Sequence, residues 1–187
     1  MKTKIIGIAG LAGSGKDTVG EAIQAFGKLE KENWEIKKFA GTLKQIASLL
    51  TGLKPEVFES QEHKSKNLGK EWGHMTIREM LQRIGTEAMR DNLHPNVWVN
   101  ALFSDYDHNN RWIITDLRFP NELQAIRDHN GMVIKVVRPG VVGMNHYSET
   151  ALNNFNKWDH IIHNDGTRYD LVQKVRQIYY GEDEKNQ

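Results

Sequence analysis

The sequence predicts an α/β protein in which helices cover both faces of a doubly wound parallel sheet. Short apolar runs alternate along the chain with longer amphipathic segments, which is the pattern of parallel strands joined by helical crossovers. Several of these runs are almost continuously apolar, as expected for strands that are buried on both faces. At 187 residues the chain has room for a full α/β core, and we expect a single domain over residues 1–187.

The apolar runs place the expected strands at residues 4–9, 35–40, 111–115, 132–137 and 160–163. Helical periodicity places the expected helices at residues 17–29, 42–50, 76–92, 95–106, 121–129 and 169–180. Ligands of such sheets gather beyond the carboxyl ends of the strands, so we expect the site there.

A long interval separates the second expected strand from the third. Residues 41–110 are far more than one crossover needs, and they predict a helical insertion beyond the ends of the strands. Within it, the charged and poorly periodic stretch 59–73 is expected to be a mobile loop. The tail at 181–187 is polar and is expected to be disordered.

The strongest motif is a glycine-rich loop directly after the first expected strand. It reads Gly10-Leu11-Ala12-Gly13-Ser14-Gly15-Lys16-Asp17-Thr18. Glycines let backbone N–H groups wrap a phosphate, and the following helix points its positive end at the same anion. Lys16 supplies a mobile charge for the β and γ phosphates. We therefore expect ATP to contact Gly13, Ser14, Gly15, Lys16, Asp17 and Thr18.

One departure from the strict phosphate-loop pattern is informative. Asp17 stands where Ser or Thr is usual, and the hydroxyl comes one residue later, at Thr18. A hydroxyl in that place would meet a phosphate or a metal-bound water from a different angle. The arrangement resembles that of nucleoside and nucleotide kinases of the adenylate-kinase type more than that of GTPases or motor ATPases.

The expected helix at 76–92 has two distinct sides. Apolar residues with core spacing are Ile77, Met80, Leu81, Ile84 and Ala88. Polar residues recur beside them at four-residue intervals: Arg78, Gln82, Thr86 and Arg90. Such residues lie nearly above one another on a helix, and guanidinium and amide groups suit a phosphate and a base edge. Gly85 predicts close approach by a ligand or another backbone. The alternative is an exposed polar face with a packing glycine.

Further charged residues end the third and fourth expected strands. Asp116 occupies the usual place of an outer Mg²⁺ ligand, with a structural carboxylate as the alternative. Arg118 should point into the same cleft, while Asn121 can cap the next helix with Glu122 in its first turn. Arg138 could close over a triphosphate, with a plain surface arginine as the alternative.

Composition excludes several classes of function. The net charge of +1 gives no general attraction to nucleic acid or to a membrane surface. The absence of cysteine excludes disulfides and thiolate metal sites. The apolar run near the N-terminus is too short for a signal peptide or a membrane span. We expect a cytoplasmic protein, in the host cytoplasm if the chain is viral.

Taken together, these motifs resemble the deoxynucleoside monophosphate kinases of tailed bacteriophages. The motifs that carry the resemblance are Gly13 to Thr18, Phe39-Ala40 with Leu43-Lys44, Leu81-Gln82-x-x-Gly85-Thr86-Glu87-x-x-Arg90, Trp98, Thr115-Asp116-x-Arg118-Phe119-Pro120-Asn121-Glu122, His146-x-Ser148-Glu149 and Asn164-Asp165-Gly166. The sequence departs from the family at Gly41-Thr42, where Asp-Pro is expected, so no carboxylate contact to substrate is expected from this loop.

The resemblance implies a nucleoside-monophosphate-kinase fold with a five-stranded parallel sheet, a helical insertion about 41–110 that binds the acceptor, and a short lid about 139–150. The implied reaction is ATP + dNMP ⇌ ADP + dNDP with Mg²⁺. This reaction supplies DNA precursors. The implied partners are free nucleotides, and a homodimer is left open. His146 is expected to organise its loop.

The same resemblance distributes roles among the residues. The loop at 10–18 would bind the donor phosphates, with Asn164 near the adenine. The residues that would bind the acceptor nucleotide are Lys44, Arg78, Gln82, Thr86 and Arg90. Arg118 and Arg138 would clamp the transferring phosphoryl, and Asp116, through water, with Thr18 would order the metal. Two alternatives stay open: another small-molecule P-loop kinase, such as a dephospho-coenzyme-A kinase, and a non-catalytic ATP-binding regulator.

Overall fold

The computed structural model describes residues 3–143 and 147–181, and the chain divides into two compact units. Unit 1 combines Met1–Lys38 with Tyr106–Gln187, and unit 2 is Phe39–Asp105. His146, part of the lid expected about 139–150, and nearly all of the expected disordered tail lie outside the described residues.

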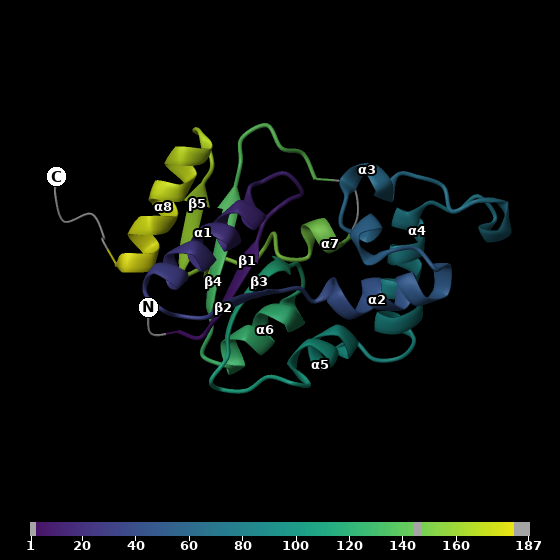
Figure 1. The fold of residues 1–187 in the computed structure, drawn as a ribbon, viewed down its shortest axis with the longest axis horizontal. Coiled ribbons are helices and arrows are strands. Elements are labelled where there is room, and N and C mark those ends of the chain that lie inside the picture. Colours follow the sequence, from purple (N-terminus) through teal and green to yellow (C-terminus); the bar gives the residue numbers. More distant parts are fainter. Residues whose placement is uncertain (1–2, 144–146, 182–187) are drawn as a thin grey trace. The chain divides into compact units, whose positions relative to one another are not determined.

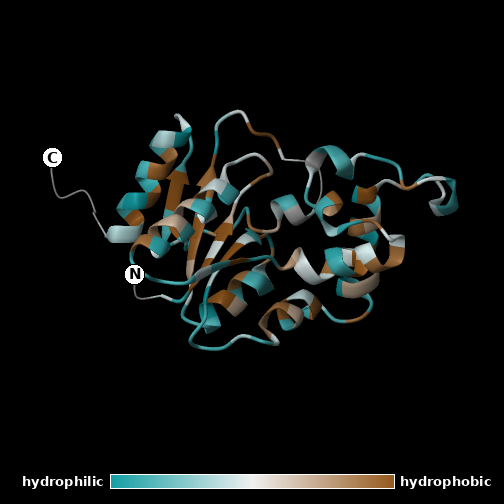
Figure 2. Ribbon diagram, in the orientation of Figure 1, coloured by the Kyte–Doolittle hydropathy of each residue, from teal (hydrophilic) through white to brown (hydrophobic). Residues whose placement is uncertain are grey.

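Unit 1 is built on a parallel sheet whose strands match the apolar runs of the sequence. The strands are β1 Ile5–Ala9, β2 Trp34–Lys37, β3 Arg111–Leu117, β4 Met132–Val137 and β5 His160–His163. They lie in the order β2-β3-β1-β4-β5, and every neighbouring pair is parallel. The strands are the most hydrophobic part of the ribbon in Figure 2. The predicted five-stranded α/β fold is confirmed.

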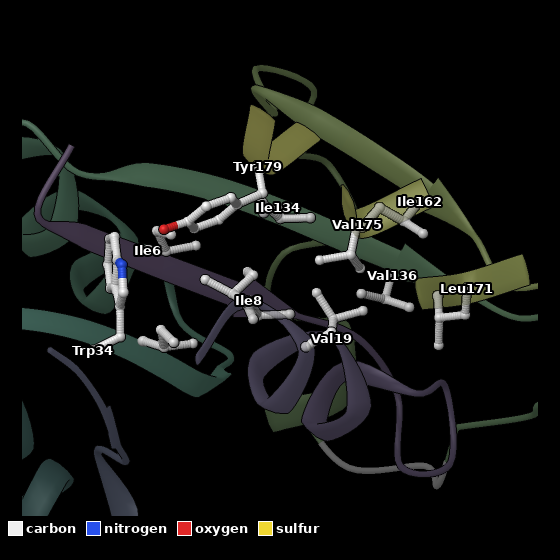
Figure 3. Close-up of a cluster of buried hydrophobic side chains, with 13 residues drawn as sticks. Ile6, Ile8, Val19, Trp34, Ile134, Val136, Ile162, Leu171, Val175 and Tyr179 are labelled. Carbon is white, nitrogen blue, oxygen red and sulfur yellow. The ribbon is translucent and has the colours of Figure 1, made fainter. Parts of the chain in front are cut away.

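Helices pack against both faces of this sheet (Figure 1). On one face, α1 (Lys16–Leu29) and α8 (Arg168–Tyr180) contact each other, and their apolar side chains join those of the strands in one core, shown in Figure 3. On the other face, α6 (Pro120–Asp128) contacts β1 and β4. Successive residues of β1 face opposite sides of the sheet. Ile8 joins the core under α1, whereas a Cβ at Gly7 would lie 2.4 Å from Ile126 of α6. The short helix α7 (Tyr147–Thr150) precedes β5.

Unit 2 is helical throughout its regular structure. Its elements are α2 Ala40–Thr51, η1 Pro55–Phe58, α3 Gln61–Lys64, η2 Lys70–Trp72, α4 Ile77–Gln82, the π-helical segment η3 Arg83–Asp91 and α5 Val97–Phe103. Ala47, Phe58 and Ile77 form its buried apolar centre. The stretch 59–73, expected to be a loop, contains the short helices α3 and η2. The expected strand at 35–40 was placed too far along the chain, because β2 ends at Lys37 and α2 begins at Ala40.

No helix in the described parts of the chain is both long and apolar enough to span a membrane.

Candidate functional site

The glycine-rich loop joins β1 to α1 in the manner that the sequence predicts. Gly13 and Gly15 have φ angles of +81° and +99°, which only glycine adopts at low cost. The Ser14 N–H donates to the Leu11 carbonyl at 3.0 Å and closes the turn. Gly15 is the N-cap of α1, so Lys16 is the first residue of that helix. The loop therefore presents the positive end of a fourteen-residue helix beside its glycines.

Lys16 and Asp17 form an ion pair at the start of α1. The Lys16 ammonium lies 3.2 Å from Asp17 Oδ2, and the lysine side chain is only 12% exposed. Burial alone would raise the pKa of Asp17. The charge and hydrogen bond of Lys16, the charge of Lys38 and a hydrogen bond with Thr115 outweigh it, so the pKa lies below its usual value. The carboxylate that replaces the usual hydroxyl is thus held ionised next to the lysine.

Two residues from distant parts of the chain hold the loop in place. Asn164, which follows β5, donates its carboxamide N–H to the Ser14 carbonyl at 2.8 Å and its backbone N–H to Val137 at 2.7 Å. Arg138, which follows β4, donates to the Gly13 carbonyl at 3.3 Å. Asn164 was expected to lie near an adenine; in the structure its carboxamide binds the glycine-rich loop, and its backbone N–H binds the end of β4.

Arg118 is positioned by the start of α6. Glu122 is 2% exposed, and its Oε2 accepts hydrogen bonds from the backbone N–H groups of Arg118 (2.9 Å) and Phe119 (3.1 Å). The helix begins at Pro120, where the missing N–H is harmless. Asn121 was expected to cap this helix; that assignment was wrong, because the helix starts earlier and Glu122 provides the cap.

The ends of β1, β3 and β4 enclose a cavity of about 280 Å³ in unit 1. Its polar lining includes Ser14, Arg118, Lys135, Arg138 and Glu149, and its apolar lining includes Leu11, Leu117, Val141, Leu152 and Trp158. The Arg118 guanidinium and the Glu149 carboxylate form an ion pair at 2.5 Å. Both strand-end arginines predicted from the sequence therefore line one cavity beside the glycine-rich loop.

The two residues that the sequence predicts to order a metal ion lie near the end of β3 and in the first turn of α1. Asp116 occupies the penultimate position of β3 and is half-buried, as is Thr18 in the first turn of α1. Within residues 3–143 and 147–181, no group of three or more His, Asp or Glu side chains could by itself hold a metal ion. Any Mg²⁺ at these strand ends would need phosphate oxygens and water to complete its coordination, which is the usual mode for this cation.

The polar flank expected on the helix at 76–92 lies on α4 and η3 in unit 2. The helix starts with a capping box, in which the Thr76 hydroxyl accepts from the Glu79 N–H at 3.2 Å. The flank residues Arg78, Gln82, Thr86 and Arg90 are half-buried, while Glu79, Arg83 and Glu87 are exposed. The four predicted residues thus share an environment that differs from that of their charged neighbours on the same element.

A π-helical stretch interrupts the regular helix that was predicted. The Trp98 indole N–H donates to the Gly85 carbonyl at 2.8 Å, and we attribute the wider helical pattern to this external donor. The change of periodicity leaves Ala88 exposed, although regular spacing placed it in the core. Gly85 does allow close approach, but by the side chain of Leu43: a Cβ there would lie 2.9 Å from Leu43 Cδ2.

Lys44, predicted to bind substrate, is 8% exposed and forms an ion pair with Glu59 at 2.6 Å. Sequence reasoning assigned no role to Glu59 or to Glu149, and it did not foresee that Glu122 would hold Arg118. The sequence did place Glu122 in the first turn of α6, and a Glu three residues into a helix is the usual signal for such a cap. Glu149 stands 31 positions from Arg118, and no local pattern links them.

Comparisons with known proteins agree with this geometry. The family described as deoxynucleotide monophosphate kinase matches residues 35–175. A candidate deoxynucleotide monophosphate kinase of Acanthamoeba polyphaga mimivirus is 31% identical over 187 residues, covering 91% of this chain and 93% of the relative. The deoxynucleotide monophosphate kinase of Enterobacteria phage T4 is 31% identical over 116 residues, covering 59% of this chain and 46% of the relative.

Among solved structures, shikimate kinase from Acinetobacter baumannii in complex with shikimate has a TM-score of 0.50 at 16% identity, covering 98% of this chain and 97% of that one. This likeness is one of fold, and it agrees with the α/β architecture of the present chain. The family match covers three quarters of the sequence and extends across both units. The chain therefore belongs to the deoxynucleotide monophosphate kinase family.

Proposed function

We propose that this protein transfers the γ-phosphoryl group of ATP to a deoxynucleoside monophosphate, giving ADP and the deoxynucleoside diphosphate. The observation that carries the proposal is the glycine-rich loop with Lys16, placed beside a cavity that Arg118 and Arg138 line. Such an arrangement offers one strand-end region rich in positive charge, which suits a phosphoryl group in transfer.

The donor nucleotide is assigned to unit 1. Backbone N–H groups of the loop from Gly13 to Thr18 and the Lys16 ammonium would hold the β and γ phosphates. Asn164 would act through the loop that it fixes. Asp17 would hold Lys16 in position, since the two side chains are paired at 3.2 Å.

The acceptor nucleotide is assigned to unit 2. Arg78 and Arg90 would bind its phosphate through charge-assisted hydrogen bonds, while Gln82 would read the base edge and Thr86 would add a hydroxyl. Lys44 belongs to the same assignment, and its ion pair with Glu59 would set the direction of its ammonium.

The half-buried oxygens of Asp116 and Thr18 suit Mg²⁺, which favours carboxylate, hydroxyl and water oxygens. Asp116 would hold this ion through water. When bound, Mg²⁺ neutralises negative charge on the transferring phosphates. The acceptor phosphate is already an anion, so no general base is required of the protein. The chain's own contribution is to position both nucleotides and to surround the phosphoryl group with Lys16, Arg118 and Arg138.

We further propose that the partners are free nucleotides of the cytoplasm and not nucleic acid. This part of the proposal is supported by the net charge of +1, which gives no overall attraction to a phosphate backbone.

A turnover panel tests the proposed function. The purified protein is incubated with γ-labelled ATP and Mg²⁺, and each dNMP, each NMP and dephospho-coenzyme A is offered separately. We expect label to appear on at least one dNMP. Transfer to dephospho-coenzyme A alone would identify a different kinase. Binding of ATP with no transfer to any acceptor would identify a nucleotide-binding regulator.

A further inference from the structure

Lys135 is the one charged residue of β4, a strand that is otherwise apolar. The side chains of Ile134 and Val136, labelled in Figure 3, join the core beneath α1 and α8. Because successive residues of a strand face opposite sides, Lys135 lies on the other face of the sheet, where it is half-buried. A lysine at this position breaks the apolar pattern of the strand, and such departures are expected at functional positions.

The charge of Lys135 is not balanced by a carboxylate of the described chain. Among residues 3–143 and 147–181, no ion pair includes Lys135. Its ammonium lies 5.7 Å from the centre of the Trp158 ring, close to the limit of about 6 Å for a cation–π contact. A half-buried ammonium is poorly solvated, so this environment favours an anion that comes from outside the chain.

The sequence of the neighbouring segment supports the same conclusion. Residues 144–146, which follow the lining residue Val141 along the chain, are Met, Asn and His and include no carboxylate. The described chain ends just after α8, at the far end of α1 from the glycine-rich loop, where the Tyr180 hydroxyl donates to Glu30 at 3.0 Å.

Lys135 lines the cavity that the ends of β1, β3 and β4 enclose. It pairs in register with Ala9, the last residue of β1 before the glycine-rich loop. The charged residues of the lining are three cations and one carboxylate: Arg118, Lys135, Arg138 and Glu149. Because Arg118 and Glu149 form an ion pair, the charges of Lys135 and Arg138 remain. The cavity therefore has a net positive charge.

Phosphate oxygens suit this group of cations. An ammonium is a compact charge with three N–H donors and no acceptor, and guanidinium groups also match phosphate oxygens. We infer that Lys135 binds a phosphate oxygen of a nucleotide in this cavity, as a third cation beside Arg118 and Arg138. This inference rests on the proposed function in taking the bound anions to be nucleotides. The oxygen belongs either to ATP or to the dNMP, and the two sources are separable by experiment.

The test uses Lys135→Met, which removes the charge and keeps an unbranched side chain. Dissociation constants for ATP and for each dNMP are measured separately by calorimetry. Loss of a charge-assisted hydrogen bond predicts binding about ten- to a hundred-fold weaker for the nucleotide whose phosphate Lys135 contacts, with little change for the other. Lys135→Arg keeps a cation and should recover part of the lost affinity.

Phosphate-free ligands show which part of the nucleotide is involved. Adenosine and each deoxynucleoside should bind Lys135→Met as they bind the wild type. A nucleoside that loses as much affinity as its nucleotide would place Lys135 on the sugar or the base and overturn the inference.

The matched control is Lys37→Met. The Lys37 ammonium likewise lies over an indole, 5.1 Å from the centre of the Trp112 ring, and Lys37 is not among the residues that line the cavity. This variant should leave every dissociation constant unchanged, and equal weakening in it would overturn the inference. So would unchanged binding of both ATP and dNMPs by Lys135→Met.

Thermal melting of the unliganded proteins separates binding from a structural role. Lys135→Met should melt no lower than the wild type, because the described fold uses no ion pair of Lys135. A much lower melting temperature, with both nucleotides weakened alike and no recovery in Lys135→Arg, would make the lysine structural. Because calorimetry needs no turnover, these outcomes stand apart from a failure to detect phosphoryl transfer.

Discussion

Lys16 can be replaced with little expected effect on the fold. Its ammonium pairs with the neighbouring residue Asp17, and because this contact joins no distant parts of the chain, its removal should leave the fold intact. Loss of one charge aimed at the reacting phosphates is expected to lower kcat at least about a hundred-fold in Lys16→Ala. The measurement is steady-state turnover alongside thermal melting.

Lys28→Ala is the matched control for that substitution, because Lys28 is exposed in the last turn of the same helix. It should turn over at the wild-type rate. Near-normal kcat in Lys16→Ala would remove the loop lysine from the mechanism.

Arg90 tests the assignment of the acceptor to unit 2. Arg90 is half-buried, and its guanidinium donates to the Pro95 carbonyl at 3.4 Å. Arg90→Ala should weaken dNMP binding about ten- to a hundred-fold, because a charge-assisted phosphate contact contributes about 1.5–3 kcal/mol. Binding of ATP alone should hardly change. Calorimetry with each nucleotide separately gives both quantities.

Arg83 provides the control for Arg90, since it is an exposed arginine on the same π-helical segment. Arg83→Ala should bind both nucleotides normally. An Arg90→Ala protein that loses ATP binding and keeps dNMP binding would show that the donor and acceptor sites are assigned the wrong way round.

For single residues, the sequence predicts a role correctly where that role depends only on neighbours along the chain. Gly13, Gly15 and Lys16 follow one another in a motif, and their backbone angles follow from residue type alone. The pairing of Arg118 with Glu149 is different, because it depends on how β3 and α7 are brought together. Only the folded chain shows that Glu149 pairs with Arg118 at a cavity beside the loop.

Among the elements, the π-helical segment Arg83–Asp91 has an identifiable cause. The Trp98 side chain is 4% exposed, and its indole N–H donates to the Gly85 carbonyl. Trp98→Phe keeps an aromatic ring and removes the donor, leaving a buried carbonyl with a lost partner. The free energy of unfolding should fall by about 1–3 kcal/mol, measured by denaturant titration.

The same variant should disturb the acceptor site more than the donor site, because Gln82, Thr86 and Arg90 lie on either side of Gly85. We expect a raised KM for dNMP with KM for ATP unchanged. Unaltered stability together with unaltered KM for dNMP would mean that the indole hydrogen bond does not shape this segment. The π pattern itself could not be predicted from the sequence, because its cause lies on another helix, thirteen residues away.

Glu32 links three elements of unit 1 and provides a test that depends on pH. Its carboxylate accepts from Tyr179 at 2.6 Å and from Trp34 at 2.9 Å, and it pairs with Arg111 at 3.1 Å. Burial alone would raise the pKa of Glu32, but the two hydrogen bonds and the Arg111 charge outweigh it and hold the pKa below its ordinary value.

A pKa that is lower in the folded state stabilises the protein when the group is ionised. The stabilisation by Glu32 should therefore be complete above the unfolded-state value of about 4.3 and be lost as the pH falls through the lower folded value. The difference in unfolding free energy between wild type and Glu32→Gln should shrink from pH 7 toward pH 3. A difference that stays constant over this range would exclude ionisation of Glu32 as its source.

On the scale of the whole molecule, the sequence correctly predicts the parallel sheet and most of its helices. The strands are recognisable because they are buried on both faces and are nearly continuously apolar. The interval between β2 and β3 forms a compact unit, Phe39–Asp105. Its elements η1, α3 and η2 have only three or four residues each, too few to show a helical period. Local pattern therefore describes unit 1 better than unit 2.

The division into two units gives the final prediction, which concerns where each nucleotide protects the backbone from hydrogen exchange. ATP, as the ligand of the glycine-rich loop, should slow exchange most at residues 10–18 in unit 1. A dNMP should slow exchange most at residues 76–92 in unit 2, where the polar flank lies. The readout is peptide-level exchange with each nucleotide alone at saturating concentration. Lys16→Ala should lose the ATP-dependent protection and keep the other, while Arg90→Ala should do the reverse. Protection of residues 76–92 by ATP and not by any dNMP would show that the acceptor does not bind in unit 2.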